Sequence, residues 1–411
     1  MPSSSKTCHR FALALGLSAG APLACALPTD AGNDGGADGG PHEELRAQVM
    51  NSVAYQAVAP TFENANTEAK ALEASTAAYV LALGSADEGE ALVAARDAWR
   101  TSMSAWQRVE MMQLGPAGAS SKVIGGADRR DEAYSWPSTN SCRVDQELVL
   151  GEFEAEDFTS TRLVNTYGLD AIEYLLFHAG PDNTCAPQLP INAEGEWATL
   201  DEQQLRTSRA NYAAAIAHAL ALETTELAAA WSPDDGSFTR HLADPRDADS
   251  PYENLPTAMN EVLRAMFYLD TTVKDVKVAV PAGILDCASA PCISELESTW
   301  ARHNQAIVTA NLVAFSMLFH GGESADSGTG FDDLLVAYGE EALATKMTAD
   351  IEAALAAVAA VEASFAEALA ADPLALDASH AAIREITDSL KGDFATILML
   401  TVPSEAAGDA D

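Results

Sequence analysis

The sequence has few basic residues, few aromatic residues and, beyond its N-terminus, no long apolar run. Only 23 lysines and arginines stand against 61 aspartates and glutamates in 411 residues, giving a formal net charge of −38. The shortage of positive charge argues against nucleic acid as a partner, because a nucleic-acid-binding surface must neutralise phosphates. No apolar run beyond the N-terminus reaches the roughly 18 residues that a membrane-spanning helix needs. Aromatics at 7% and abundant alanine favour packed helices over a β-sandwich.

The N-terminus has the pattern of an export signal. Lys6 and Arg10 precede the apolar stretch 11–23, and small residues follow it. A basic start, a short apolar middle and an Ala-x-Ala end predict a secretory signal peptide over residues 1–26. We therefore expect a protein of the bacterial cell envelope, either periplasmic or an outer-membrane lipoprotein.

Two processing sites fit this signal. Signal peptidase would cut after Ala26, whereas lipoprotein processing before Cys25 would leave that cysteine carrying a lipid. The Gly- and Asp-rich segment 27–42 has the composition of a flexible tether, which suits an anchored protein. Any membrane association is expected to occur only through such an N-terminal lipid.

Four cysteines remain in the processed chain, at positions 142, 185, 287 and 292. An even number in an oxidising compartment predicts disulfides, and four cysteines allow three pairings. Cys287 and Cys292 close a short loop easily. Cys142 and Cys185 would then pair with each other. A zinc site is the alternative, but CxxC spacing and nearby histidines are both missing.

From residue 43 onward apolar residues recur at helical spacing, which predicts an all-α fold of two packed helical bundles. The first bundle is expected over residues 43–231 and the second over 252–402. A polar, acidic, proline-containing linker is expected at 232–251, and an acidic tail at 403–411. The expected helices include the ranges 88–114, 159–178, 199–231, 294–319 and 330–370.

One of these helices carries a pair of acids in the sequence Gly168-Leu-Asp-Ala-Ile-Glu-Tyr-Leu-Leu-Phe177. Asp170 and Glu173 lie about 60° apart on a helix, so both face the same side. Carboxylates on neighbouring turns can share one hard cation. Acidic pairs at this spacing also occur commonly on solvated helix surfaces.

This stretch resembles the motif of the imelysin-like family, Gly-x-His-x-x-Glu followed by Tyr-Leu-Leu-Phe, with Asp170 in place of the motif histidine. The family also has a long helix that ends with Trp, Glu and then Gly-Pro, matched here by Trp106, Glu110 and Gly115-Pro116. The resemblance covers about residues 43–402 and implies an all-helical, two-bundle envelope protein. Further matches are Trp136-Pro137, Asp145, Glu297-Ser298, Asn311-Leu312 and Gly330-Phe331.

The resemblance also implies a metal site at the motif, with Glu173 carried over as a ligand and Glu110 as the matching acid on a facing helix. Asp170 changes the chemistry, because imidazole suits zinc, iron and copper whereas carboxylates suit calcium, magnesium or manganese. The expected ligands are thus Glu110, Asp170 and Glu173, and the expected ion is iron, calcium, magnesium or manganese rather than zinc. His178 lies about 80° around the helix from Asp170, too far to replace the missing histidine.

Three functions remain open at this point. The family was named for a peptidase and includes iron-regulated envelope proteins and relatives of the periplasmic component of ferrous-iron uptake. The first hypothesis is a protein that binds a metal ion or small ligand and hands it to an envelope iron-uptake partner. The second is a metal-dependent peptidase, although a zinc hydrolase normally has three protein ligands. The third is a structural envelope module with a degenerate site. We assign no catalytic residue.

Overall fold

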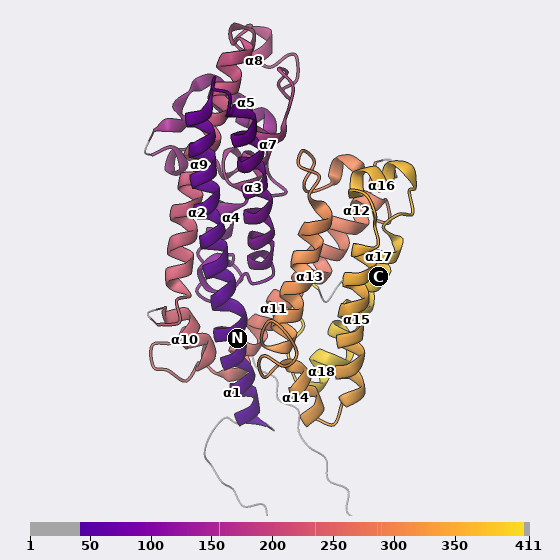
Figure 1. Cartoon of the computed structure of the whole chain (residues 1–411). Coiled ribbons are helices and arrows are strands. Elements are labelled where there is room, and N and C mark those ends of the chain that lie inside the picture. Colours follow the sequence, from indigo (N-terminus) through magenta and orange to yellow (C-terminus); the bar gives the residue numbers. More distant parts are fainter. Residues whose placement is uncertain (1–41, 156, 235, 286, 289, 407–411) are drawn as a thin grey trace, which may run out of the picture. The chain divides into compact units, whose positions relative to one another are not determined.

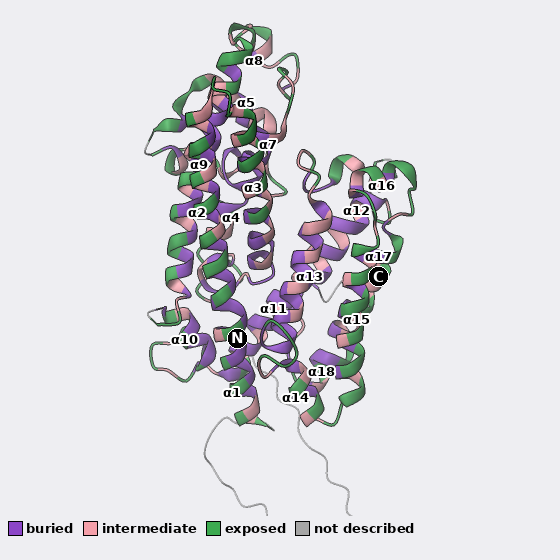
Figure 2. Cartoon of the chain, in the orientation of Figure 1, coloured by how far each residue is buried: buried purple, intermediate pink, exposed green. Residues whose placement is uncertain are grey.

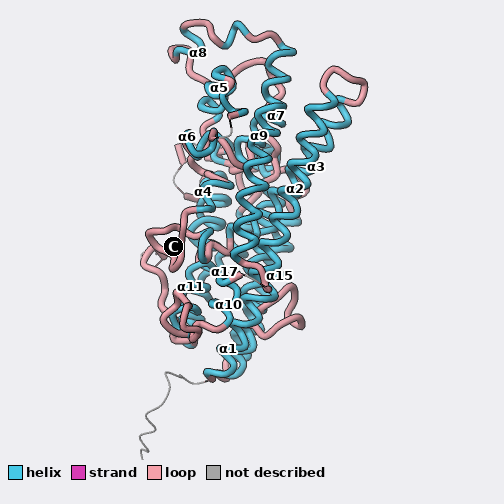
Figure 3. Tube along the Cα trace, turned by 90° about the vertical axis from the view of Figure 1, so that its left-hand side faces the viewer, coloured by secondary structure: helices cyan, strands magenta, loops and turns pink. Residues whose placement is uncertain are grey.

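The computed structural model describes residues 42–155, 157–234, 236–285, 287–288 and 290–406. The predicted signal peptide and almost all of the predicted tether therefore lie outside the described residues. Every regular element in the described part of the chain is a helix, as Figure 3 shows. The prediction of an all-α fold is confirmed. None of the described helices is both long and apolar enough to cross a membrane.

The first group of helices is built around α2 (Ala59–Ala82), which packs against α3 (Glu88–Glu110) and α9 (Glu202–Ala230). The short helix α7 (Leu169–Phe177) lies against both α3 and α9. These helices form the indigo-to-magenta part of Figure 1.

The second group contains α13 (Asn304–His320), α15 (Glu341–Ala359) and α17 (Asp377–Ser389), each packed against the next. These helices form the orange and yellow part of Figure 1. The two groups meet where α13 packs against α3. The prediction of two packed helical bundles is confirmed by this arrangement.

The remaining described elements are further α-helices, three π-helical segments and several single 3-10 turns. The α-helices among them are α1 (Glu43–Ser52), α4 (Arg129–Ala133), α5 (Ser141–Leu150), α6 (Phe158–Thr161), α8 (Pro190–Ala193), α10 (Ser237–Ala243), α11 (Leu255–Met266), α12 (Val280–Ala282), α14 (Phe331–Ala337), α16 (Phe365–Ala371) and α18 (Ala395–Ile397). The π-helical segments are Val53–Val58, Leu269–Ala279 and Leu390–Phe394.

Helix α3 shows how the sequence pattern becomes packing. Trp99, Met103 and Trp106 recur at three- and four-residue spacing, and all three are buried. The first turn carries Glu88 and Glu90, which suits the positive end of the helix dipole. Figure 2 shows the same division along the long helices, with buried positions on the faces turned toward other helices. Trp99 and Trp106 therefore belong to the core.

Three predicted helices are interrupted in the structure. The range 159–178 contains the end of α6, which stops at Thr161, and α7, which begins at Leu169 directly after Gly168 (φ +90°). The range 330–370 is three helices, and Gly339 (φ +85°) separates the first two. The range 294–319 becomes helical only at Asn304, since the preceding residues form the turns that wrap around Glu173. In each case tertiary contacts or a positive φ override the apolar spacing.

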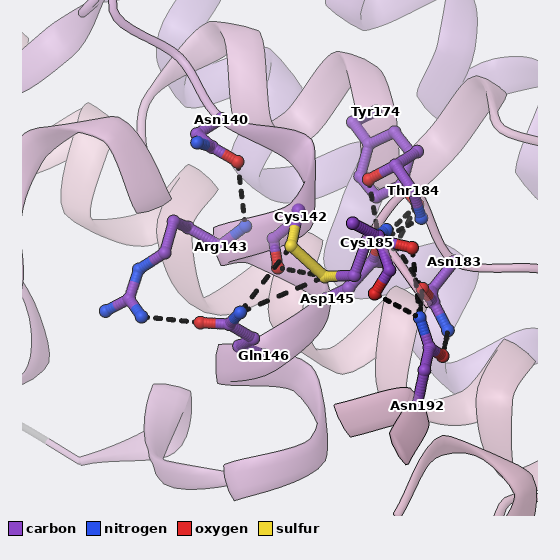
Figure 4. The surroundings of a disulfide bond; sticks show 11 residues. Asn140, Cys142, Arg143, Asp145, Gln146, Tyr174, Asn183, Thr184, Cys185 and Asn192 are labelled. Atoms are coloured by element: carbon purple, nitrogen blue, oxygen red, sulfur yellow. Dashed lines mark hydrogen bonds between the residues drawn. A yellow bond between two sulfur atoms is a disulfide. The ribbon is translucent and has the colours of Figure 1, made fainter. Parts of the chain in front are cut away.

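Both predicted disulfides are present, joining Cys142 to Cys185 and Cys287 to Cys292. The first ties α5 to the loop that follows α7 (Figure 4). In that loop Thr184 donates to Asp145 through its backbone N–H (2.8 Å) and its hydroxyl (2.9 Å). Asp145 in turn accepts a hydrogen bond of 2.8 Å from the hydroxyl of Tyr174. The disulfide thus helps to fix α7, the helix that carries the motif acids.

Candidate functional site

The motif helix α7 begins at a glycine that no other residue can replace without strain. Gly168 has φ +90° and ψ −176°, a region open essentially only to glycine. A Cβ at this position would lie 2.8 Å from the carbonyl oxygen of Ala133. The indole N–H of Trp99 on α3 donates to the carbonyl of Leu169 at 2.7 Å. The start of α7 is therefore set by close packing against two other segments.

Asp170 and Glu173 line the same cavity, which has a volume of about 340 Å³. They are only 7% and 4% exposed. Trp136 and Trp300 also line this cavity. The structure therefore brings the two motif acids together on one enclosed surface, as their helical spacing predicted, and excludes the solvated-surface alternative.

Asp170 is held by hydroxyl groups rather than by cations. Its Oδ2 accepts hydrogen bonds from the hydroxyl of Ser135 (2.9 Å) and from that of Thr139. Its Oδ1 accepts from the backbone N–H of Ala171 at 2.9 Å. Burial raises the pKa of Asp170 above its ordinary value, and these hydrogen bonds oppose the rise only in part.

Glu173 is bound by a turn from the other helix group. Its Oε1 accepts from the hydroxyl of Ser298 (2.8 Å) and from the backbone N–H groups of Trp300 (2.9 Å) and Ala301 (2.8 Å). Burial raises the pKa of Glu173 to about 7, although these donors act in the opposite direction. All three bonds go to Oε1, so Oε2 is free of these donors.

Glu110, the third predicted ligand, lies in a different set of contacts. It is fully buried at the end of α3, and its Oε2 lies 2.8 Å from Nη2 of Arg130. Oε2 also accepts from the hydroxyl of Tyr268 (2.8 Å), and Oε1 accepts from the indole of Trp106 (2.9 Å). Burial acts to raise the pKa of Glu110, but the charge and hydrogen bonds of Arg130 hold it below its ordinary value.

Glu110 does not line the cavity of Asp170 and Glu173. Among the described residues, no group of three or more His, Cys, Asp or Glu side chains is placed to hold a metal ion. The three-carboxylate ligand set stays a prediction. In this structure two of its members share a cavity, and the third is engaged by an arginine.

Sequence reasoning did not assign two further charged residues at this site, Glu297 and Lys277. Glu297 lines the cavity, and its Oε1 accepts from the hydroxyl of Tyr134 (2.7 Å) and lies 3.1 Å from Nζ of Lys277. Its Oε2 is buried and has no hydrogen-bond partner in the described part of the chain. Burial lowers the pKa of Lys277. The Glu297-Ser298 match to the family was the only sequence signal for Glu297, and Lys277 had none.

Two of the four acids described above have a cationic partner in the part of the chain that the structure describes, and two do not. Glu110 is matched by Arg130, and Glu297 by Lys277. Within the described residues, Asp170 and Glu173 form no ion pair with any lysine, arginine or histidine. Asp170 and Glu173 are therefore the two buried acids of this cavity without a cationic partner among the described residues.

The other sequence candidates have structural contacts. His178 stacks on Tyr174, with ring centroids 5.0 Å apart, and its Nε2 lies 2.8 Å from the carbonyl of Asp182. It is a helix-end residue, as its position around the helix predicted. Asp131, on α4, pairs with Arg130 at 3.0 Å.

The model of the imelysin family, a peptidase family, matches residues 58–392 of this sequence. The chain belongs to the imelysin family. Two solved structures share its fold at 18% sequence identity. One, from Parabacteroides distasonis, is named for an iron-regulated protein A precursor; it has a TM-score of 0.63, with 89% of this chain and 96% of that chain covered. The other is an imelysin-like protein from Psychrobacter arcticum, with a TM-score of 0.62 and coverages of 88% and 97%.

No curated protein matches the chain. As a member of the imelysin family, the chain keeps the glycine and the glutamate of the motif and has an aspartate in place of the histidine. The structure explains why aspartate fits there: hydroxyl donors from Ser135 and Thr139 satisfy one of its oxygens. These donors come from the irregular segment between α4 and α5.

Proposed function

We propose that this imelysin-family protein binds a small divalent cation in the cavity lined by Asp170 and Glu173. The observation that carries the proposal is that these are the two buried carboxylates without a cationic partner at the site. Burying a charge is costly unless it is paired or coordinates a metal. A divalent cation would supply the two positive charges that the two acids lack.

The donor set supports a hard cation that keeps part of its water. Asp170 and Glu173 offer carboxylate oxygens, and Glu297 on the same cavity has one further oxygen without a hydrogen-bond partner among the described residues. Magnesium-like ions are bound in this way, by one or two carboxylates and several waters. A zinc hydrolase normally needs three protein ligands, usually including histidine. The peptidase hypothesis therefore has less support from this donor set.

Ferrous iron is among the cations that such a site would take, and the name of the Parabacteroides distasonis structure refers to iron regulation. Export to the cell envelope is part of the same proposal, and it is supported by the signal pattern of residues 1–26. Intact-mass measurement of the membrane fraction tests whether Cys25 carries a lipid. A cytoplasmic protein that retains its N-terminus would contradict the proposal of export.

Isothermal titration calorimetry with Mn²⁺, and with Fe²⁺ under anoxic conditions, tests the cation site. We expect one saturable site per chain, and Asp170→Asn and Glu173→Gln should each weaken it at least about tenfold. Glu295→Gln is the matched control, because Glu295 lines the same cavity but is exposed; it should change the affinity less than about twofold. Absence of saturable binding, or equal weakening by all three substitutions, would overturn the proposal.

A further inference from the structure

A second cavity, of about 280 Å³, lies at the C-terminal end of α7 and is lined by three arginines. We propose that this cavity binds a small oxyanion through Arg96, Arg206 and Arg209, together with Tyr79. The chain has only 23 lysines and arginines against 61 acidic residues. Three arginines around one cavity therefore give this cavity a positive charge in a protein whose net charge is strongly negative. This site is separate from the cation cavity and does not rest on the function proposed above.

Arg209 is the most buried of the three arginines, with 8% of its surface exposed. Its Nη1 donates to the carbonyl of Gly180 at 2.7 Å, and its Nη2 to that of Asp182 at 3.3 Å. These bonds hold the loop that follows α7, but they leave Nε buried without a hydrogen-bond partner in the described structure. Within the described residues Arg209 forms no ion pair with a carboxylate. A bound anion would stabilise this buried guanidinium group, because the group has no carboxylate partner among the described residues.

Arg96 is only partly buried, but it too lacks an ion pair among the described residues. Its Nε donates to the carbonyl of Leu176 at 2.8 Å, and its guanidinium carbon lies 5.4 Å from the centre of the Phe177 ring. Its two terminal nitrogens make no hydrogen bond, and it forms no ion pair, within the described part of the chain. Burial, and then the nearby charge of Arg100, lower the pKa of Arg96. The terminal nitrogens of Arg96 are therefore available as donors to a ligand in the cavity.

Tyr79 and Arg206 complete the donor set. Tyr79 is 5% exposed, and its hydroxyl makes no hydrogen bond to any described residue. Burial, and then Glu88, raise the pKa of Tyr79, so the hydroxyl stays a neutral donor. Arg206 pairs with Glu88 at 2.9 Å, and the exposed Glu202 also lines the cavity. Three arginines against these two acids still leave an excess of positive charge.

The chemistry of the lining selects the class of ligand. Guanidinium groups bind carboxylate and phosphate oxygens through parallel N–H donors, and a phenol adds a further donor. A cavity of about 280 Å³ admits a small anion with several oxygens and not a polymer. The ligand class is therefore a small polycarboxylate or a phosphate, and the two sources share the same recognition chemistry.

Calorimetric titration of the full chain with citrate and, separately, with inorganic phosphate tests the inference and distinguishes the two sources. We expect one saturable site for at least one of them, weakened about tenfold or more by Arg96→Gln. Arg100→Gln is the matched control, since it removes the same charge one turn along α3 from a residue outside the cavity. That variant should shift the affinity less than about twofold.

A second variant covers the case in which Arg96→Gln does not fold. Tyr79→Phe removes only the hydroxyl and should weaken the same anion about threefold to tenfold while the thermal unfolding midpoint stays near that of the wild type. Failure of both anions to saturate the wild type would overturn the inference. So would equal weakening by Arg96→Gln and Arg100→Gln, because that result is expected of diffuse charge attraction alone.

Discussion

Arg130 and Glu110 form a buried ion pair, with Nη2 and Oε2 2.8 Å apart and no part of the Glu110 side chain exposed. Glu110 would serve as a cation ligand only if Arg130 moved away, because hydrogen bonds from Arg130 reach both of its oxygens. We therefore predict that Glu110→Gln lowers stability by about 3 to 5 kcal/mol, the usual cost of leaving one partner of a buried pair alone. The affinity for Mn²⁺ should change little.

Urea unfolding and calorimetry on the same Glu110→Gln sample separate the two effects. A variant that keeps its stability but loses the cation would contradict this assignment. It would restore Glu110 to the ligand set that the family resemblance implied.

Gly168 and Gly151 provide a matched pair for the backbone of the motif. Both have positive φ, +90° and +69°, but a Cβ at Gly168 would lie 2.8 Å from a backbone oxygen, whereas a Cβ at Gly151 would have no described atom within 4 Å. We predict that Gly151→Ala costs about 1 kcal/mol and Gly168→Ala about 3 kcal/mol or more. Denaturant unfolding of both variants measures the difference, and equal costs would show that the close approach at Gly168 relaxes freely.

Glu173 should make stability depend on pH. Its pKa is about 7 in the folded protein against 4.5 as the ordinary value, so between these values the folded state holds a proton that the unfolded state has lost. The free energy of unfolding therefore falls as the pH rises through this window, by about 3 kcal/mol for this group. Glu173→Gln keeps an oxygen acceptor for the Ser298–Ala301 turn, and it should remove this pH-dependent contribution to the free energy of unfolding.

The measurement is the difference in the free energy of unfolding between wild type and Glu173→Gln, followed from below pH 4.5 to above pH 7 without added metal. The wild type should lose stability relative to the variant as the pH rises. A constant difference, or one of opposite sign, would show that Glu173 is charged throughout.

The two disulfides should contribute unequally to stability. Cys142 and Cys185 are 43 residues apart in the sequence, whereas Cys287 and Cys292 are 5 apart. In the chain-entropy treatment the longer loop is worth about 4 kcal/mol and the shorter about 2 kcal/mol. Paired Cys→Ala variants of each bridge, compared by denaturant unfolding, test the order. A larger loss from the short loop would contradict it.

Much of the helical framework could be predicted because apolar spacing is local information. Helix α9 was expected over 199–231 and is Glu202–Ala230, with Asp201 and Gln204 forming its capping box. Positions where a glycine with positive φ interrupts that spacing, such as Gly168 and Gly339, could not be placed from periodicity alone. The apolar pattern continues across these two glycines, whereas the α-helical conformation of the backbone is interrupted there.

The candidate site was predictable only in part, for a similar reason. Asp170 and Glu173 share a face because they are three residues apart, which the sequence shows directly. The partners that decide their charge state come from far along the chain, 35 residues from Asp170 for Ser135 and 125 from Glu173 for Ser298. Arg130, which neutralises Glu110, lies on the short helix α4, which is not among the helices predicted from the sequence. Pairing of distant charges needs the tertiary structure.

The turn around Glu173 also has a mechanical consequence. The carboxylate belongs to a helix of the N-terminal half, and its three donors precede α13 in the C-terminal half. Any hinge motion that separates the two halves must break these three bonds together and expose the carboxylate to water. Glu173 is thus one of the side chains that join the two halves, together with Gln107, which bonds to Glu297 and Asn311 across the same boundary.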